Sequence, residues 1–323
     1  MNTRKLGNSD LLLTTVGLGT WAIGGPWQYG WGPQDDDQAI KAIIEALDEC
    51  QVNWIDTAPI YGCGHSEQLI GKAIKLASAT PIIATKCSLL WNNKREKISC
   101  LKADSIRREC EDSLKRLDID VIDLYQVHWP QPEEDLEQAA EALAKLLDQG
   151  KIRYVGVSNF TIEHIERFKK IVPVTSLQPQ YSMIHRQIED GLLDYCGKNG
   201  IGIVAYSPMA MGLLTGKFDR ERFNNLPKDD VRRKSPDFQP PKFDATLELV
   251  DRLKDIANRN GRPLAQLAIA WVLRKPEVTS AIVGARKPGQ MKETAHAMDW
   301  LLKENEIEEI EELLQDRNSK INK

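Results

Sequence analysis

The sequence predicts an α/β protein folded as one closed (β/α)8 barrel, the TIM-barrel architecture, with residues 1–323 forming a single domain. Apolar runs of about four to seven residues alternate with amphipathic stretches of about ten to fifteen, which is typical of repeated β-α units and a parallel sheet. No break in composition separates the runs. Because α/β barrels often exceed about 200 residues as one domain, one barrel is favoured over two doubly wound sheets.

Eight apolar runs are expected to form the barrel strands, because each is bounded by residues typical of turns. They are Val16–Gly19, Trp54–Asp56, Ile82–Lys86, Val121–His128, Tyr154–Ser158, Ser176–Gln180, Gly202–Tyr206 and Ala281–Gly284.

Amphipathic segments between these runs predict the outer helices. They are Asp37–Glu49, Glu67–Lys75, Ala103–Leu117, Leu136–Gln149, Thr161–Lys170, Leu192–Lys198 and Leu247–Arg259, with one more helix after Pro288. Ser66 and Asp104 are candidate N-caps, because their side-chain oxygens can accept from the free N–H groups of a first helical turn. Gly150 and Gly200 follow helix ends, where a left-handed residue is favoured.

Five segments fall outside the eightfold repeat. Arg4–Thr14 predicts a β-hairpin that caps the barrel at its N-terminal end. Gly24–Gln34 and Ser207–Phe243 are long connections, which in compact domains usually form lids or binding loops. Leu264–Arg274 predicts an additional helix before the last strand, and Glu304–Gln315 a closing helix on the outside. The extra loops and helices are expected at the C-terminal face.

Composition limits the class of protein. With 41% hydrophobic and 28% charged residues, the chain can form a sizeable core. A net charge of −4 without a basic stripe argues against a nucleic-acid partner. No stretch approaches about 18 consecutive apolar residues, the start is polar, and the six cysteines form no Cys-x-x-Cys pair. We therefore expect a cytoplasmic monomer or weak homo-oligomer that acts on a small molecule, without membrane association or a metal.

Reactive side chains follow the ends of three consecutive predicted strands. Asp56 ends the second strand, Tyr61 follows it, Lys86 ends the third strand and His128 the fourth. Each alone has an ordinary explanation: a turn residue, a rim aromatic, an outward-reaching lysine and a core histidine. Because the active site of such a barrel lies at the C-terminal ends of the strands, their convergence favours a catalytic site.

These four side chains suit the reduction of a carbonyl group. Hydride addition to the carbonyl carbon leaves negative charge on the oxygen, so a proton donor is needed there. Tyr61 is the candidate donor. We expect Lys86 to lower its pKa, since one ammonium at about 4 Å is worth about 4 kcal/mol at an effective dielectric of about 20. Asp56 would hold Lys86, and His128 would orient the carbonyl.

The chain resembles the aldo-keto reductases over nearly its whole length, because their motifs occur in family order. These are Gly17-Leu18-Gly19-Thr20-Trp21, Trp54-Ile55-Asp56-Thr57-Ala58 with Tyr61-Gly62, Thr85-Lys86, Val127-His128-Trp129-Pro130, Gly156-Val157-Ser158-Asn159-Phe160, Gln178-Pro179-Gln180-Tyr181 and Tyr206-Ser207-Pro208. Gly212-Leu213-Leu214-Thr215-Gly216-Lys217 is similar to the bacterial branch of inositol-catabolism and general-stress reductases. Channel β-subunits are more distant relatives.

The resemblance implies an NADP(H)-dependent oxidoreductase that reduces aldehydes, ketones or sugar carbonyls to alcohols. It implies Tyr61 as the acid, Lys86 and Asp56 as its modulators and His128 as the carbonyl binder. It also implies a set of cofactor-binding residues: Thr20, Trp21, Asp56, Ser158, Asn159, Gln178, Tyr206, Ser207, Pro208, Gly212, Leu213, Lys217, Gly284, Arg286, Gln290 and Glu293.

Parts of this cofactor set have more specific implied roles. Ser158, Asn159 and Gln178 would bind the nicotinamide amide, and Tyr206 would stack beneath the ring unless it is a core tyrosine. The residues from Ser207 to Lys217 would line the pyrophosphate, or else form a mobile surface loop.

The preference for NADPH rests chiefly on Arg286. Arg286 would grip the 2′-phosphate unless it is a solvated surface residue. Gly284, Gln290 and Glu293 would lie near the 2′-phosphate and adenine. Gly289, Gln290 and Thr294 depart from residues frequent in the family.

Two further signals are rejected, and one other function remains open. Gly17-x-Gly19-x-x-Ala22 formally matches a dinucleotide fingerprint, but the following Gly24-Gly25-Pro26 prevents the helix that this mechanism needs. Cys63, His65 and Cys87 fit no zinc-ligand spacing.

The alternative to an enzyme is a nucleotide-binding redox sensor that regulates a partner with little turnover, as the resemblance to channel β-subunits allows. The intact catalytic set favours the enzyme.

Overall fold

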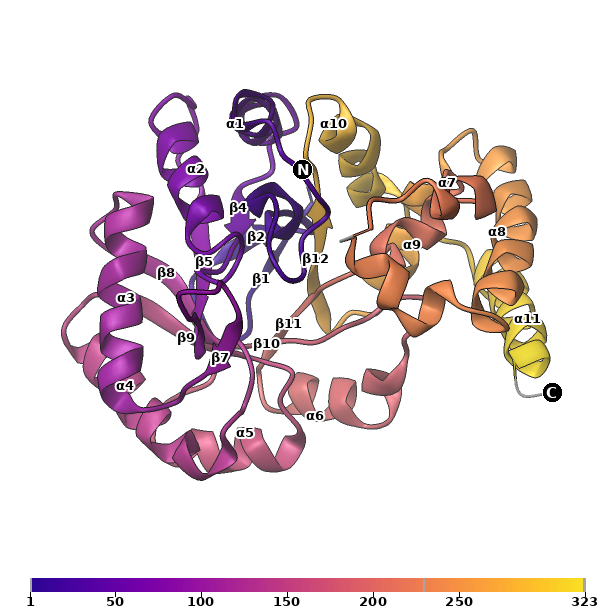
Figure 1. Cartoon of the computed structure of the whole chain (residues 1–323). Coiled ribbons are helices and arrows are strands. Elements are labelled where there is room, and N and C mark those ends of the chain that lie inside the picture. The colour runs from indigo at the N-terminus through magenta and orange to yellow at the C-terminus, as the bar shows by residue number, and fades with distance from the viewer. Residues whose placement is uncertain (1, 229, 322–323) are drawn as a thin grey trace.

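The computed structural model describes residues 2–228 and 230–321 and contains eight parallel strands in a closed barrel, surrounded by helices (Figure 1). Around the barrel the strands follow the order β10-β11-β12-β3-β4-β5-β8-β9. Their bounds are β3 Val16–Gly19, β4 Trp54–Asp56, β5 Ile82–Cys87, β8 Ile122–Val127, β9 Ile152–Ser158, β10 Ser176–Gln178, β11 Gly202–Ala205 and β12 Val278–Gly284. The prediction of eight barrel strands is confirmed.

Strand β12 begins three residues before the predicted start. The prediction missed these residues because the first part of the strand is polar. Thr279 and Ser280 are buried, although their side chains are not apolar. The Ser280 hydroxyl donates a hydrogen bond to the Thr14 carbonyl oxygen at 2.7 Å and accepts one from the Trp54 indole at 3.1 Å. Polar residues with such partners can occupy a barrel interior.

The predicted helices are present, with ends that differ by a few residues. Their bounds are α1 Asp36–Ile44, α2 His65–Ile74, α3 Ala103–Leu117, α4 Leu136–Asp148, α5 Ile162–Lys169, α6 Leu192–Lys198, α7 Arg220–Asn224, α8 Lys242–Arg259, α9 Leu264–Leu273, α10 Gln290–Ala295 and α11 Glu304–Ile321. A π-helical turn, Glu45–Glu49, continues α1. Helix α7 lies within the long Ser207–Phe243 connection, of which residue 229 is outside the described residues.

The two expected N-caps are wrong, whereas both C-terminal glycines are confirmed. Ser66 lies inside α2, and its hydroxyl donates to the Thr20 hydroxyl at 2.9 Å. Asp104 lies inside α3 and pairs with Arg107 one turn later. Gly150 and Gly200 have φ angles of +69° and +64°, the left-handed conformation that glycine adopts without steric cost.

The N-terminal hairpin closes one end of the barrel, as predicted. It consists of β1 (Thr3–Lys5) and β2 (Leu12–Thr14). Leu6, Leu11 and Leu13 are buried against the inward-facing side chains of the barrel, including Trp54. At Gly17 a Cβ would lie only 2.0 Å from the Trp54 ring, so the indole can cross the barrel only over a glycine.

A second hairpin, β6 (Leu89–Trp91) with β7 (Lys97–Ser99), lies at the C-terminal face and was not predicted. It follows β5 directly, and Arg95 at its tip donates to the carbonyl oxygens of Gly62 at 3.1 Å and Pro26 at 3.3 Å. The tip therefore joins the Gly24–Gln34 connection to the segment that carries Tyr61.

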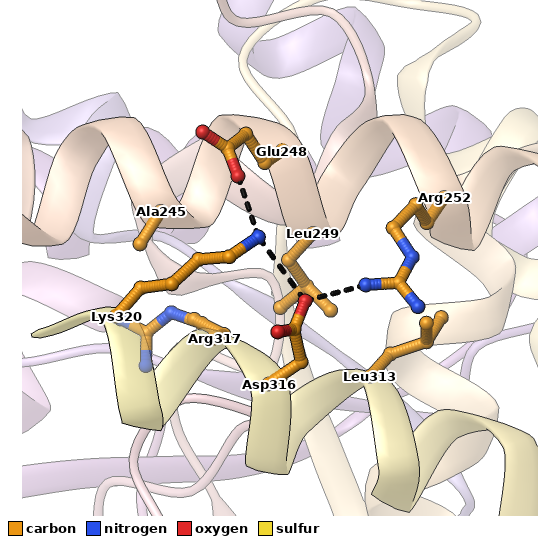
Figure 2. A pocket seen from close by; sticks show the side chains of 8 residues that line it. All are labelled: Ala245, Glu248, Leu249, Arg252, Leu313, Asp316, Arg317 and Lys320. Atoms are coloured by element: carbon orange, nitrogen blue, oxygen red, sulfur yellow. Dashed lines mark hydrogen bonds and ion pairs between the residues drawn. The ribbon is translucent and has the colours of Figure 1, made fainter.

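The closing helix α11 lies beside α8 and extends six residues beyond its predicted end (Figure 1). In the groove between them, Asp316 accepts from Arg252 at 2.5 Å and pairs with Lys320, which also binds Glu248 (Figure 2). These side chains are largely exposed, so each pair is worth at most about 1 kcal/mol. None of the helices in the described ranges combines the length and apolarity needed to cross a membrane.

Candidate active site

Three neighbouring strands bring the predicted catalytic residues to one end of the barrel. Asp56 ends β4, Lys86 is the penultimate residue of β5, and His128 follows β8. Tyr61 reaches the same place through a tight turn after β4. A Cβ at Gly62 (φ +66°) would lie 2.0 Å from the Gly24 carbonyl oxygen, so glycine allows the close packing that positions Tyr61.

Lys86 is fully buried and has an acceptor for each N–H of its ammonium group. Its Nζ lies 2.7 Å from Asp56 Oδ2, 2.8 Å from the Thr57 carbonyl oxygen and 3.3 Å from the Tyr61 hydroxyl oxygen. Because the Tyr61 oxygen can accept from Lys86, the Tyr61 proton is left to point elsewhere.

The prediction that Lys86 lowers the pKa of Tyr61 is wrong. Burial raises the pKa of Tyr61 well above its ordinary value, and the charge of Asp56 raises it further. Burial lowers the pKa of Lys86, which Asp56 counteracts. The physical reason is first the burial of the phenol, which disfavours its charged form, and second the carboxylate of Asp56, which lies 2.7 Å from the ammonium and opposes its effect on Tyr61. Tyr61 therefore keeps its proton at neutral pH.

The second oxygen of Asp56 accepts from two glutamines. Gln178 Nε2 lies 2.8 Å from Asp56 Oδ1, and Gln126 Nε2 lies 3.3 Å from it. Gln126 was not predicted as a site residue. Its signal was available, since it is a polar residue in an apolar strand two positions before His128, and alternate strand residues share a face.

His128 packs its ring edge-to-face against Tyr61, with centroids 5.8 Å apart. Burial lowers the pKa of His128 well below its ordinary value, and the charges of Lys86 and Lys97 add to this. Its Nδ1 is buried and finds no hydrogen-bond partner among the described residues. A neutral imidazole retains one N–H that can donate to a carbonyl oxygen.

This environment predicts an acid-sensitive contribution of His128 to stability. Below the unfolded pKa of about 6.5, the unfolded chain binds a proton that the folded site excludes, so stability falls as pH decreases, by up to about 1.4 kcal/mol per pH unit. Urea unfolding of His128→Gln should therefore show a weaker loss of stability between about pH 7 and pH 5.5 than the native chain. His296→Gln, at an exposed histidine, should keep the native slope. Equal slopes for native protein and His128→Gln would contradict a neutral buried His128.

The residues implied for the nicotinamide amide form one hydrogen-bonded network. The Ser158 hydroxyl donates to the Gln178 carbonyl oxygen at 2.8 Å, and Asn159 Nδ2 donates to the Ser158 hydroxyl at 3.0 Å. Tyr206 donates to Asn159 Oδ1 at 3.0 Å, and burial raises the pKa of Tyr206 to about 12. Gln178 connects this network to Asp56.

Thr20 and Trp21 follow β3 and differ in their contacts. Thr20 is fully buried, and its hydroxyl donates to the Asp56 carbonyl oxygen at 3.0 Å, so it fastens β4 to its neighbours. Trp21 is half-buried and packs edge-on against Trp31, with ring centroids 5.7 Å apart. The cofactor role of both remains a prediction.

The implied pyrophosphate segment follows β11 and has an unusual backbone. Ser207 has a φ of +56° and Gly212 a φ of +100°, and a Cβ at Gly212 would face open space. Pro208 and Leu213 belong to the same segment. At its end Lys217 pairs with both Glu293 oxygens, at 2.5 and 2.6 Å, which links this segment to α10.

Arg286 follows β12 beside Gly284 and is tied to the Gly24–Gln34 connection. Its guanidinium donates to Gln34 Oε1 at 2.7 Å and to the carbonyl oxygens of Trp31 at 3.2 Å and Pro33 at 2.6 Å. Two of its five N–H groups remain for another acceptor. Gln290 accepts from the Arg286 backbone N–H at 2.6 Å. Arg286 thus holds the Gly24–Gln34 connection against the end of β12 and is also a candidate phosphate ligand.

The residues of the two rejected signals have the following places in the structure. The segment after Gly19 is a single 3-10 turn, Trp21–Gly24, and not the helix of a dinucleotide fingerprint. His65 binds Asp36 at 2.9 Å, whereas the Cys87 sulfur faces the Gln126 carbonyl oxygen. Within residues 2–228 and 230–321, no three His, Cys, Asp or Glu side chains gather in a group that could hold a metal ion.

A closed parallel barrel with a buried lysine–aspartate pair, a phenol and an imidazole at the C-terminal strand ends defines a (β/α)8-barrel enzyme. The Aldo/keto reductase family model matches residues 15–315. The chain therefore belongs to the aldo/keto reductase family of oxidoreductases, which use a nicotinamide cofactor.

Curated and solved relatives agree with this family. Over 318 aligned residues the chain is 40% identical to aldo-keto reductase YhdN of Bacillus subtilis. The alignment covers 98% of this chain and 94% of the relative. The chain is 34% identical to the NADH-specific methylglyoxal reductase of Escherichia coli, covering 93% of this chain and 94% of the relative. The glycerol dehydrogenase AKR11B4 of Gluconobacter oxydans superimposes with a TM-score of 0.89 at 38% identity, covering 98% and 95% of the two chains.

Proposed function

We propose that this chain is an NADP(H)-dependent reductase of aldehydes, ketones or sugar carbonyls, acting as one domain over residues 1–323. The observation that carries the proposal is the contact of Lys86 Nζ with both Asp56, at 2.7 Å, and Tyr61, at 3.3 Å. The relatives fit this chemistry, since one is named a methylglyoxal reductase and another a glycerol dehydrogenase.

Tyr61 would act as the proton donor to the carbonyl oxygen. Lys86 donates to the Tyr61 oxygen, so the phenolic proton can point at a substrate bound at the C-terminal end of the barrel. Although burial raises the pKa of Tyr61, an alkoxide is far more basic than a phenolate, so the proton still moves downhill once hydride has reached the carbon. The ammonium of Lys86 would then stabilise the phenolate that forms.

His128 would orient the substrate, and Asp56 would position Lys86. A neutral His128 can donate one hydrogen bond to the carbonyl oxygen without adding a charge to the site. Asp56 is fixed by Gln178 and Gln126, which keeps the lysine from moving away from Tyr61. These contacts preorganise the polar groups around the position where negative charge develops.

The polar side chains at the C-terminal end of the barrel fit a nicotinamide. When bound, the nicotinamide supplies a hydride from C4. Ser158, Asn159 and Gln178 carry amide and hydroxyl groups that complement a carboxamide, and Tyr206 offers a flat ring nearby. Ser207, Pro208, Gly212, Leu213 and Lys217 would lie along the pyrophosphate, and Gly284, Gln290 and Glu293 beside the adenosine. Thr20 and Trp21 would border the nicotinamide.

Cofactor choice gives a prediction for Arg286→Ala. Loss of a charge-assisted contact to the 2′-phosphate is expected to weaken NADPH binding by about 1.5–3 kcal/mol, or about 10- to 150-fold, while NADH binding changes much less. Fluorescence titration of both nucleotides measures this.

Gln34→Ala is the matched control for this prediction, because it removes the hydrogen bonds between the Gln34 side chain and Arg286 but keeps the cation. It should affect the two cofactors equally. Equal losses of NADPH and NADH binding in Arg286→Ala would remove the phosphate role and leave only the bracing role. The NADH-specific relative makes this outcome informative.

The function itself is tested by following NADPH and NADH oxidation with a panel of aldehydes, ketones and sugars. Turnover of at least one carbonyl is expected, with loss of turnover in the Tyr61 variant described below. Failure with every carbonyl and both cofactors would overturn the proposal. The alternative of a nucleotide sensor without turnover is less well supported, because the lysine, aspartate, tyrosine and histidine lie together.

A further inference from the structure

Aromatic side chains surround the two candidate catalytic residues that solvent can reach. Tyr61 is 9% exposed and His128 is half-buried. Trp27 lies beside Tyr61, with ring centroids 6.4 Å apart, and Tyr29 packs edge-on against Trp27 at 5.3 Å. Three more half-buried tryptophans pack around Tyr61 and its neighbours: Trp21, Trp91 and Trp129. Such walls suit a flat aromatic substrate, which can stack on the rings or meet them edge-on.

The hairpin of β6 and β7 turns one of its two faces toward Tyr61. Leu89 on β6 is buried in the same cluster as Tyr61, and Trp91, two positions later and therefore on the same face, packs against that cluster. Lys97 on β7 lies directly opposite Trp91. Residues directly opposite each other in an antiparallel pair share a face, so the Lys97 side chain lies on the side of the hairpin that faces the active site.

The position of Lys97 is fixed by contacts with the Gly24–Gln34 connection. Its backbone N–H donates to Gln28 Oε1 at 3.1 Å, and its Nζ lies 5.8 Å from the centre of the Tyr29 ring. Its charge reaches the candidate catalytic residues, since the pKa of His128 is lowered first by burial, then by Lys86 and then by Lys97.

Lys97 is a cation without an acidic partner. It is exposed and forms no ion pair within residues 2–228 and 230–321, whereas Lys102, soon after β7, pairs with Asp135 at 2.5 Å. The neighbouring carboxylate of Glu96 is bound to Asn92 at 2.8 Å. An anionic group of a substrate could therefore pair with Lys97 without displacing an existing ion pair.

We propose that the substrate is an aromatic aldehyde with a carboxylate at the end of the ring opposite the carbonyl. This inference rests on the proposed carbonyl reduction. The carbonyl would lie between Tyr61 and His128, and the ring would contact the tryptophans. The carboxylate belongs at the opposite end because Trp27 and Tyr29 stand between Tyr61 and Lys97. Lys97 is thus the residue that selects for charge.

The test compares two aldehydes of the same shape, 4-carboxybenzaldehyde and 4-formylbenzamide, which carry a carboxylate and a neutral amide. The ratio of their kcat/KM values is measured in the native chain and in variants, so that the different reactivity of the two carbonyls cancels. Lys97→Met should lower this ratio at least about fivefold, since an exposed ion pair is worth up to about 1 kcal/mol. Raising the ionic strength to about 1 M should shrink the difference, because salt screens exposed charges.

Two further variants make the result specific. Lys97→Glu reverses the charge and should lower the ratio more than Lys97→Met does. Lys94→Met removes an equal charge from an exposed position between β6 and β7, and it should keep the native ratio.

A binding measurement tests the same preference without turnover. Titration with the alcohols 4-(hydroxymethyl)benzoate and 4-(hydroxymethyl)benzamide, in the presence of oxidised cofactor, is followed by tryptophan fluorescence. The native chain should bind the benzoate at least about fivefold more tightly than the benzamide, and Lys97→Met should lose this preference.

Three results would overturn the inference: a native kcat/KM ratio in Lys97→Met, an equal fall of the ratio in Lys94→Met, or equal binding of the two alcohols by the native chain. Each is distinct from a failure of the proposed function. Reduction of both aldehydes with the same ratio in every protein would leave the reductase and remove the charge selection. Reduction of neither aldehyde, with the benzoate still bound through Lys97, would leave the carboxylate site and count against the reductase.

Discussion

Replacement of Tyr61 by phenylalanine is expected to lower kcat for carbonyl reduction by about 10²- to 10⁴-fold, the usual range for loss of a positioned general acid. The ring and its packing against His128 remain, and only the hydroxyl that contacts Lys86 is removed. The affinity for the reduced cofactor should change little, because the proposed cofactor contacts come from other side chains. Steady-state oxidation of NADPH and fluorescence titration of the cofactor measure the two quantities.

Tyr125→Phe provides the matched control for Tyr61→Phe. Tyr125 lies on β8, is fully buried and belongs to the core between the barrel and the helices. Its loss of a hydroxyl should leave kcat within about twofold of native, so an effect seen only at Tyr61 reflects chemistry and not the general loss of a buried phenol. A Tyr61→Phe rate within a few-fold of native would exclude Tyr61 as the donor.

Lys86→Met is expected to lower both stability and activity. It leaves the Asp56 carboxylate buried with only Gln178 and Gln126 as side-chain donors. Breaking a buried ion pair in this way typically costs about 3–5 kcal/mol in the free energy of unfolding. The rate of carbonyl reduction should fall at least about 100-fold, because the group that stabilises the Tyr61 phenolate is lost. Urea unfolding and steady-state kinetics provide the two readouts.

The double variant Asp56→Asn with Lys86→Met separates these two effects. Replacing both charges removes the unpaired carboxylate, so most of the lost stability should return. Activity should not return, since no cation then contacts Tyr61. A double variant as unstable as Lys86→Met would contradict the buried pair as the origin of the stability loss, and a Lys86→Met enzyme with native kcat would contradict its role in catalysis.

The barrel and the position of the candidate catalytic residues could be predicted from the sequence because both follow from local patterns. Eight apolar runs give eight strands, and parallel strands collect the residues at their C-terminal ends on one face. Asp56, Lys86 and His128 come from three neighbouring strands, so their proximity required only the strand order. Tyr61 follows within a short turn whose glycines are visible in the sequence.

Features that depend on contacts between distant segments could not be predicted in this way. The hairpin of β6 and β7 has strands of three residues, too short for a periodic signal, and its tip is fixed by Arg95 contacts to Pro26 and Gly62. The bracing of Arg286 by Gln34 joins segments about 250 positions apart. The direction of the Tyr61 pKa also required the structure, because the sequence shows neither the burial of the phenol nor the distance between Lys86 and Asp56.

The central claim is that this chain transfers hydride from a nicotinamide to a carbonyl carbon, with Tyr61 as the proton donor. The most direct measurement uses NADPH that carries deuterium at both C4 positions, with mass spectrometry of the alcohol formed from the best substrate of the carbonyl panel. We predict one deuterium on the former carbonyl carbon with the native chain, and formation of this product at least about 100-fold more slowly with Tyr61→Phe. Alcohol without deuterium, or equal rates of labelled product from both proteins, would contradict the account.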